Sequence, residues 1–116
     1  MESLNRIEIQ GTLGRISTTK IGGGKLHANF SVATNYAYKD ATGNAIVETT
    51  WHRISAFEGE KISAETLNEI RKRYAENRDF VYVRVVGRLR QIRYVDTNGV
   101  SNSTYEVRAS EVEILK

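Results

Sequence analysis

The 116-residue sequence contains no cysteine and no long hydrophobic run. The absence of cysteine excludes a disulfide framework, a thiolate zinc site and a cysteine nucleophile. No stretch approaches the roughly 18 consecutive apolar residues of a membrane span. The first residues also lack the apolar core of a secretory signal. We therefore expect a cytoplasmic protein, with no membrane partner, that folds as one domain over residues 1–116.

Candidate catalytic and metal-binding groups are also few. The two histidines, His27 and His52, do not show the HxH or HxxxH spacing of a metal site. The sequence has no GxSxG nucleophile elbow, and no carboxylate pair stands out by its spacing. Residues 22–25 lack both the first glycine and the final Ser or Thr of a phosphate-binding loop, and they favour a flexible hairpin loop. We expect no catalytic residue, no metal and no cofactor.

Alternating hydrophobicity predicts a chain made mostly of strands. Ile7, Ile9 and Leu13 alternate with polar residues, while Gly11 and Gly14 around Leu13 predict a bulge or a tight bend. Further strand patterns cover about residues 27–38, 45–57, 80–95 and 103–115, with Gly87 interrupting the fourth. This order predicts an all-β fold with one helix, namely a five-stranded Greek-key OB-fold barrel with extended β-hairpins.

One segment, residues 61–76, changes to helical periodicity. Leu67, Ile70 and Tyr74 fall at i, i+3 and i+7, which predicts one short amphipathic helix that contacts the core through these residues. Ser63 and Thr66 are equally good candidates for its N-cap. Its basic run is balanced by glutamates, so we interpret that side as a solvated face.

The net charge of +3 permits nucleic-acid binding without requiring it. The position of the aromatic residues is more informative. In the third strand, alternation places Ile54 and Ala56 inward and leaves Trp51, Arg53 and Phe57 on the other face. This face either packs against the helix or a partner subunit, or it stacks nucleobases beside an arginine that meets phosphates.

A second basic and aromatic stretch follows Gly87. Arg88, Arg90 and Tyr94 share one parity, and Arg93 lies beside them. Such a ribbon suits an arm that follows a polyanion, although arginines also protect an exposed strand edge from aggregation. Tyr36 and Tyr38 end the second strand in the same manner, where a strand that outruns the barrel exposes both faces.

Three stretches of the sequence resemble the OB domain of the bacterial single-stranded DNA-binding proteins. They lie at residues 5–15, 28–35 and 50–57, and residues 86–90 support them. The third stretch, Thr-Trp-His-Arg-Ile-Ser-Ala-Phe, is the most specific of them. The resemblance runs from about Leu4 to Leu115 and implies non-sequence-specific binding and protection of single-stranded DNA in replication, recombination and repair, by a protein that is not an enzyme.

The resemblance also implies roles for particular residues. The stacking aromatics of the family fall on Tyr38, Trp51, Phe57 and Tyr94. Basic contacts to DNA are expected from Arg15, Lys39, Arg53, Arg88, Arg90 and Arg93. His52 matches a position at the subunit interface of the family's usual homotetramer, and a bacterial, nucleoid-associated location follows.

The sequence departs from the family pattern in three respects. Ile16-Ser17-Thr18 replaces the usual Asp-Pro after the Gly14 region. Glu58-Gly59-Glu60 stands where a small residue followed by a basic residue is usual, which weakens the positive field locally. The chain also lacks the acidic, hydrophobic tip through which members recruit repair and replication enzymes, so we do not expect those partners. These departures leave an alternative open, a dimeric primosomal-type OB-fold adaptor that acts mainly through protein partners.

Overall fold

The computed structural model describes residues 1–116, apart from the side chain of residue 79. It contains five strands, one α-helix and two short 3-10 turns at Gly22–Gly24 and Arg78–Phe80. The strands are β1 (Ile7–Lys20), β2 (Leu26–Lys39), β3 (Ala45–Phe57), β4 (Tyr82–Val95) and β5 (Ser101–Ile114), and α1 (Ala64–Glu76) lies between β3 and β4. This element order confirms the sequence prediction.

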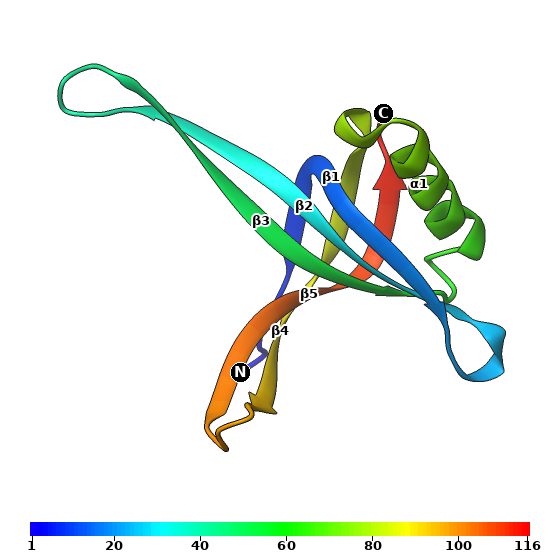
Figure 1. Ribbon diagram of the computed structural model, residues 1–116. Coiled ribbons are helices and arrows are strands. Elements are labelled where there is room, and N and C mark those ends of the chain that lie inside the picture. Colours follow the sequence, from blue (N-terminus) through cyan, green and yellow to red (C-terminus); the bar gives the residue numbers. More distant parts are fainter.

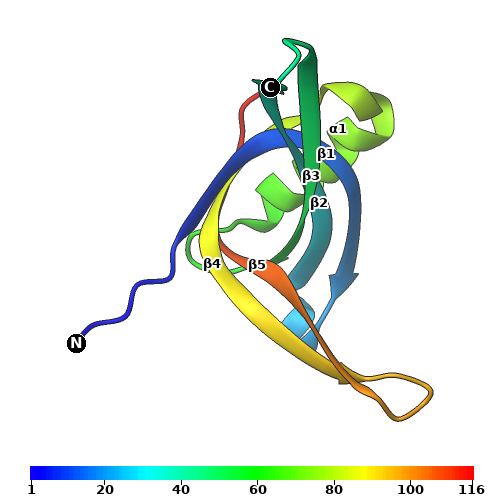
Figure 2. The ribbon, with the colours of Figure 1, turned by 90° about the vertical axis from the view of Figure 1, so that its left-hand side faces the viewer.

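The five strands close into a barrel in the order β1-β2-β3-β5-β4 (Figure 2). Neighbouring strands are antiparallel, except that β3 and β5 are parallel where they meet at Ile54 and Val107. Closure matters because it leaves no long unpaired edge in the body of the barrel. The predicted OB-fold barrel is therefore confirmed.

The core is formed by the inward residues of all five strands and by one side of α1. Ile54 and Ala56 are fully buried, as alternation predicted, and so are Leu67 and Ile70 of the helix. Tyr74 packs partly buried against the same cluster. Ser63 is the N-cap of α1, since its hydroxyl accepts a hydrogen bond from the Thr66 backbone amide at 3.1 Å. Of the two candidate caps, the structure therefore selects Ser63.

A β-bulge lies at Gly14, where the pairing of β1 with β2 shifts between Leu13 and Arg15. The bulge confirms the expectation drawn from the two glycines. Its consequence is a change of phase, because Leu13 and Ile16 both contact the core while Arg15 points outward. Strict alternation from Leu13 would have turned Arg15 inward.

Two hairpins extend beyond the barrel. Figure 1 shows the ends of β2 and β3 as a long arm and the ends of β4 and β5 as a second, shorter arm. Tyr36 and Tyr38 lie on the first arm and are 68% and 39% exposed, although Phe30 and Val32 of the same parity are buried. The two tyrosines are exposed because the arm extends beyond the barrel and has no core beneath it.

Some boundaries differ from those predicted. β1 continues through residues 14–20, because the bulge at Gly14 redirects the strand without ending it. β4 begins at Tyr82, since Arg78–Phe80 forms a 3-10 turn, and it continues past Gly87, although its pairing with β5 shifts between Val86 and Gly87. Gly87 has no side chain because a Cβ there would overlap the backbone carbonyl of Arg108 on β5.

Gly11 is a comparable close approach and yields a stability prediction. A Cβ at Gly11 would overlap the Ala33 backbone carbonyl on β2. We expect Gly11→Ala to lower the free energy of unfolding by about 1–3 kcal/mol or more, because rigid backbone must move. Equilibrium urea unfolding at fixed protein concentration measures this. Gly22→Ala is the matched control, since nothing lies within 4 Å of a Cβ there. Coincident unfolding curves for the two variants would contradict the prediction.

Candidate nucleic-acid interface

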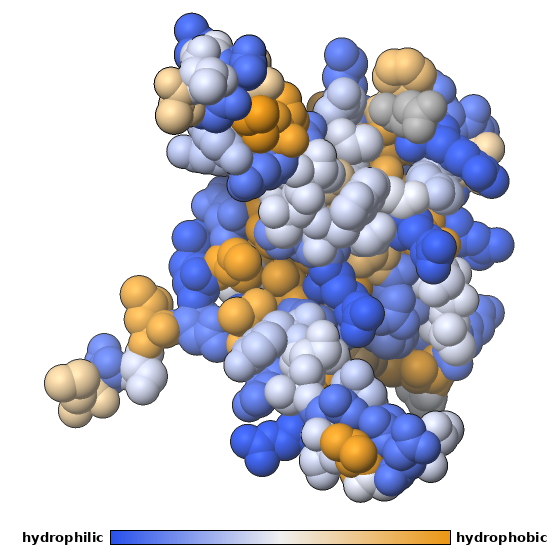
Figure 3. All heavy atoms as spheres, turned by 60° about the vertical axis from the view of Figure 1, so that its left-hand side comes forward, coloured by the Kyte–Doolittle hydropathy of each residue, from blue (hydrophilic) through white to orange (hydrophobic). Residues whose placement is uncertain are grey.

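One outward face of the barrel runs across all five strands. Cross-strand pairing aligns Ser17 with Asn29, Asn29 with Ser55, Ser55 with Arg108 and Arg108 with Arg88. A neighbouring row places Arg15 beside Ser31 and Ser31 beside Arg53. The space-filling view in Figure 3 shows the two hairpin tips standing out from the body, with a recessed surface between them. The face is therefore basic and polar, and the hairpins border it.

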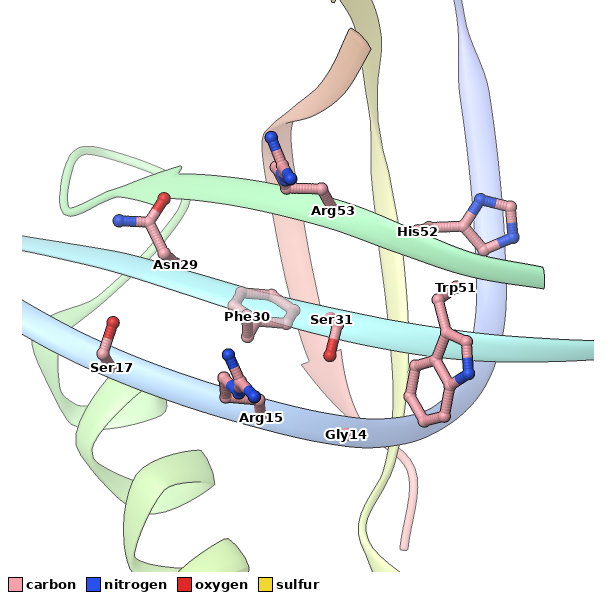
Figure 4. Close-up of a pocket in the computed structure, with 9 residues that line it drawn as sticks. All are labelled: Gly14, Arg15, Ser17, Asn29, Phe30, Ser31, Trp51, His52 and Arg53. Atoms are coloured by element: carbon pink, nitrogen blue, oxygen red, sulfur yellow. The ribbon is translucent and has the colours of Figure 1, made fainter. Parts of the chain in front are cut away.

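Trp51 forms the aromatic part of this face. Its indole is 59% exposed and extends across β2 to Gly14 of β1, as Figure 4 shows. A Cβ at Gly14 would overlap the ring, so the bulge glycine makes room for the indole. The six-membered ring of the indole is therefore supported at Gly14 while more than half of the side chain stays exposed, as a stacking surface needs.

An open groove of about 660 Å³ surrounds the indole. Its lining residues come from β1, β2 and β3 and are Gly14, Arg15, Ser17, Asn29, Phe30, Ser31, Trp51, His52 and Arg53. Two guanidinium groups, two hydroxyls and one amide thus accompany the indole (Figure 4). The structure brings together four of the residues predicted from the sequence: Trp51, Arg15 and Arg53, expected to contact DNA, and His52, expected at a subunit interface.

Phe57 is in a different environment. Its ring stacks on the His27 imidazole with centroids 4.0 Å apart and planes inclined by 17°. The Cζ atom of Arg108 lies 4.0 Å from the same centroid. His27 is on β2 and Arg108 on β5, the two strands that flank β3, so the half-buried ring lies between an imidazole and a guanidinium.

The surroundings of His27 favour the neutral form of its imidazole. Burial and the positive charge of Arg108 lower the pKa of His27 below its ordinary value of 6.5, although Glu106 acts in the opposite direction. The Nε2 atom lies 2.8 Å from the Ser55 hydroxyl, which satisfies a nearly fully buried serine. A neutral ring suits this position because protonation would place a second positive charge beside Arg108.

The β4–β5 arm carries the remaining predicted residues of the basic ribbon. Arg90 lies 3.4 Å from Glu106 and is partly neutralised by it. Arg93 and Tyr94 line a second open groove of about 420 Å³ near the hairpin tip, and Tyr94 is 50% exposed. Arg93 faces the side of the ribbon opposite to Arg90 by strand parity. The arm therefore offers positive charge on both sides.

The β2–β3 arm carries Tyr38 and Lys39. The Tyr38 hydroxyl donates to Glu48 Oε1 at 3.2 Å, and the Tyr36 and Tyr38 ring centroids are 6.0 Å apart. At the turn, hydrogen bonds from Thr42 and from the Asn44 amide hold the pKa of Asp40 below its ordinary value. Tyr38 and Lys39 pair with Ile46 and Ala45, whereas Trp51 pairs with Ala33. They therefore lie several residues from Trp51 along the same strand pair.

Several residues of the interface were not predicted. Asn29 and Ser31 line the groove, and His27 and Arg108 enclose Phe57. Arg108 follows the inward-facing Val107, so alternation along β5 could have placed it outward. Its position beside Phe57 depends on the parallel pairing of β3 with β5, which no local pattern indicates.

Two further residues singled out in the sequence, His52 and Glu58, form hydrogen bonds within the chain. His52 is half-buried, and its Nε2 atom lies 2.8 Å from the Thr34 hydroxyl, so it has a partner within the chain. Glu58 accepts a hydrogen bond from the Leu26 backbone amide at 3.0 Å, which gives this unusual acidic residue a structural role at the start of β2. Among the described residues, no group of three His, Cys, Asp or Glu side chains could hold a metal ion, and no helix is long and apolar enough to cross a membrane.

A closed five-stranded barrel with an aromatic and basic outward face is the arrangement of OB-fold proteins that bind oligonucleotides. The chain belongs to the single-strand binding protein family, whose model matches residues 4–115. The recognition made from the sequence is thereby confirmed.

Named relatives agree with this family. The "Single-stranded DNA-binding protein 1" of Xylella fastidiosa is 33% identical over 117 residues, which cover 99% of this chain and 79% of the relative. The "Single-stranded DNA-binding protein" of Neisseria meningitidis serogroup A is 30% identical over 114 residues, 97% of this chain. The chain spans 60% of the length of that Neisseria relative.

Solved structures give the same fold. A structure described as "Plasmodium falciparum SSB complex with ssDNA" aligns with a TM-score of 0.74 and 26% identity, covering 100% of this chain and 98% of the other. A single-stranded DNA-binding protein from Thermus aquaticus aligns with a TM-score of 0.68 and 20% identity, covering 97% of this chain and 51% of the other, and supports the fold alone.

The contact between Gly14 and Trp51 yields a prediction for the free protein. Gly14→Ala should displace the indole from β1, shift its emission to longer wavelength and increase its quenching by acrylamide, because the supporting contact is lost. Trp51 is the single tryptophan, so the signal reports on this site alone. Gly59→Ala is the control, since its Cβ meets only one atom, at 4.0 Å. An emission maximum and quenching equal to those of the control would contradict the contact.

The environment of His27 yields a prediction about pH. NMR titration should give His27 a lower pKa in the folded protein than in the urea-unfolded chain. Below about pH 6.5 the unfolded chain then binds more protons at this site, so the His27 contribution to the free energy of unfolding declines as the pH falls towards the folded pKa. His27→Gln should remove this part of the pH dependence. An unshifted or raised His27 pKa would contradict the prediction.

Proposed function

We propose that this protein binds single-stranded DNA without sequence preference through the outward face described above. The observation that carries the proposal is the open indole of Trp51, supported by Gly14 and flanked by Arg15 and Arg53. The printed names of the relatives, and the solved structure described as a complex with ssDNA, support the same ligand.

The proposed mechanism combines stacking with electrostatic attraction. A nucleobase stacks on the open side of the indole, because every base has a flat π-face and the contact does not depend on sequence. Arg15 and Arg53 border the ring and meet the phosphates on either side of the stacked base. Asn29 and Ser31 supply hydrogen bonds in the same groove. Double-stranded DNA fits this site poorly because its bases are already stacked on each other.

The two arms extend the proposed path. Tyr38 with Lys39 on one arm, and Tyr94 with Arg93 on the other, repeat the pairing of an aromatic ring with a positive charge. Arg88 and Arg90 connect the second arm to the barrel. Among the exposed aromatic residues, we assign stacking roles to Trp51, Tyr38 and Tyr94, and we assign phosphate contacts to the basic residues.

Assembly and cellular role belong to the same proposal. We propose a homotetramer with His52 at a subunit interface, acting in the cytoplasm to protect single strands during replication, recombination and repair, without catalytic activity of its own. The relatives are named as single-stranded DNA-binding proteins, so the alternative of a primosomal-type adaptor is not favoured. Stacking alone does not separate DNA from RNA, because a base offers the same π-face with or without a 2′-hydroxyl on its sugar.

Trp51→Ala tests the function directly. A stacked base contributes about 1–3 kcal/mol, so the affinity for fluorescein-labelled oligo(dT) should fall roughly tenfold in fluorescence anisotropy. In the unchanged protein, oligo(dT) should also quench Trp51 emission at low salt. Trp51→Phe should retain part of the affinity, since it keeps an aromatic ring.

Phe80→Ala is the matched control for the loss of an aromatic residue. Phe80 is 61% exposed and lies in the 3-10 turn after α1, outside the proposed face. The Phe80→Ala variant should bind oligo(dT) with the affinity of the unchanged protein. Oligo(dT) binding without quenching of Trp51, or equal affinities for Trp51→Ala and Phe80→Ala, would remove the stacking role.

A further inference from the structure

Phe57 differs from the other aromatic residues of the interface in having neither ring face open. The His27 imidazole and the Arg108 guanidinium each lie 4.0 Å from its ring centroid, and they come from the strands on opposite sides of β3. A base could stack on Phe57 only after one of these groups had moved away. The geometry therefore argues against a direct stacking role for this ring.

The same arrangement fixes the position of Arg108. A guanidinium over an aromatic face is held by cation–π attraction, which is stronger when the pair is partly withdrawn from water. Phe57 and Arg108 are both half-buried, and the Arg108 Cζ atom lies over the Phe57 ring. Arg108 therefore loses little further conformational freedom when it binds a ligand.

Arg108 also lies directly opposite another arginine. Arg88 and Arg108 are cross-strand partners in the antiparallel pairing of β4 with β5. Like charges directly opposite each other destabilise a sheet. Glu106, the nearby acidic residue on β5, forms its ion pair with Arg90. Among the described side chains, no carboxylate lies within ion-pair distance of Arg88 or Arg108.

The surroundings of Arg108 lower the pKa of its guanidinium. Burial lowers the pKa of its guanidinium, and the positive charges of Arg90 and Arg88 lower it further, while Glu106 partly opposes them. Two arginines at paired positions of β4 and β5, neither with a carboxylate partner, favour an anion, since one bound phosphate can relieve their repulsion and accept hydrogen bonds from both.

We propose that Arg88 and Arg108 together bind one phosphate group of the single-stranded DNA backbone, and that Phe57 is a positioning residue that orients Arg108 for this contact. The proposal rests on the proposed function, because it assigns the next phosphate site on the same face. From the Trp51 groove the strand passes Arg53 and crosses β3 to β5 and β4. It then reaches the β4–β5 arm.

The first test is the salt dependence of oligo(dT) binding. Removing one phosphate contact should reduce the log–log slope of affinity against salt concentration by about 0.7. We expect Arg108→Gln to show this change and to weaken binding roughly fivefold to tenfold at low salt. Arg108→Lys should restore most of the slope but only part of the affinity, since an ammonium cannot lie flat on Phe57. Lys72→Gln on α1 is the charge-matched control and should leave the slope unchanged.

The second test is a double-mutant cycle between Phe57 and Arg108. If Phe57 acts through Arg108, Phe57→Leu should reduce the salt slope, and the double variant should bind about as well as Arg108→Gln alone. If Phe57 stacks a base, Phe57→Leu should leave the slope unchanged, and the two losses should multiply. This second pattern would overturn the positioning role.

The outcomes separate this proposal from the proposed function. If the unchanged protein binds oligo(dT) and Trp51→Ala weakens it, while Arg108→Gln has the slope of Lys72→Gln, the phosphate site is wrong and the function stands. If the unchanged protein does not bind oligo(dT) at low salt, the proposed function itself fails. Circular dichroism, with Trp51 emission before DNA is added, identifies any variant that does not fold. The comparison of Arg108→Gln with Lys72→Gln is decisive even if Phe57→Leu fails to fold.

Discussion

The feature on which the interface depends is the bulge at Gly14 in β1. It allows the Trp51 indole to lie against the β1 backbone, where any Cβ would overlap the ring. It also changes the phase of β1, so that Ile16 returns to the core and Arg15 faces the groove. A single residue without a side chain thus provides both the support of the aromatic surface and one of its cationic neighbours.

The distribution of charge over the surface matters more than the net charge of the chain. A net charge of +3 is modest, and many of the acidic side chains are engaged elsewhere. Glu8, Glu111 and Glu113 surround Arg84, and Glu69 pairs with Arg73 on α1. The outward face, by contrast, collects Arg15, Arg53, Arg88 and Arg108 around a few neutral polar groups. A small excess of positive charge therefore produces a strong local field, because the counter-charges have been gathered on other surfaces.

Much of the fold was predictable from local patterns. Period-two alternation located the strands and the inward Ile54 and Ala56, and period 3.6 located α1, because both patterns follow directly from backbone geometry. The exposed face of β3 was predicted for the same reason, together with Trp51 and Arg53 as its candidate site residues. The environment of Phe57 was not predictable. His27 and Arg108 are 30 and 51 positions away from it, and only strand pairing brings all three side chains together.

The sequence by itself determined the local elements, five strands and a helix, and it placed aromatic residues close to arginines. Only the tertiary structure decided which aromatic rings are open and which are covered. Trp51 and Phe57 lie on the same strand with the same parity. The Trp51 indole is nevertheless exposed to solvent, whereas the Phe57 ring lies between an imidazole and a guanidinium. The physical reason is that exposure of a ring depends on the neighbouring strands, and closure of the barrel sets their register across long distances in the chain.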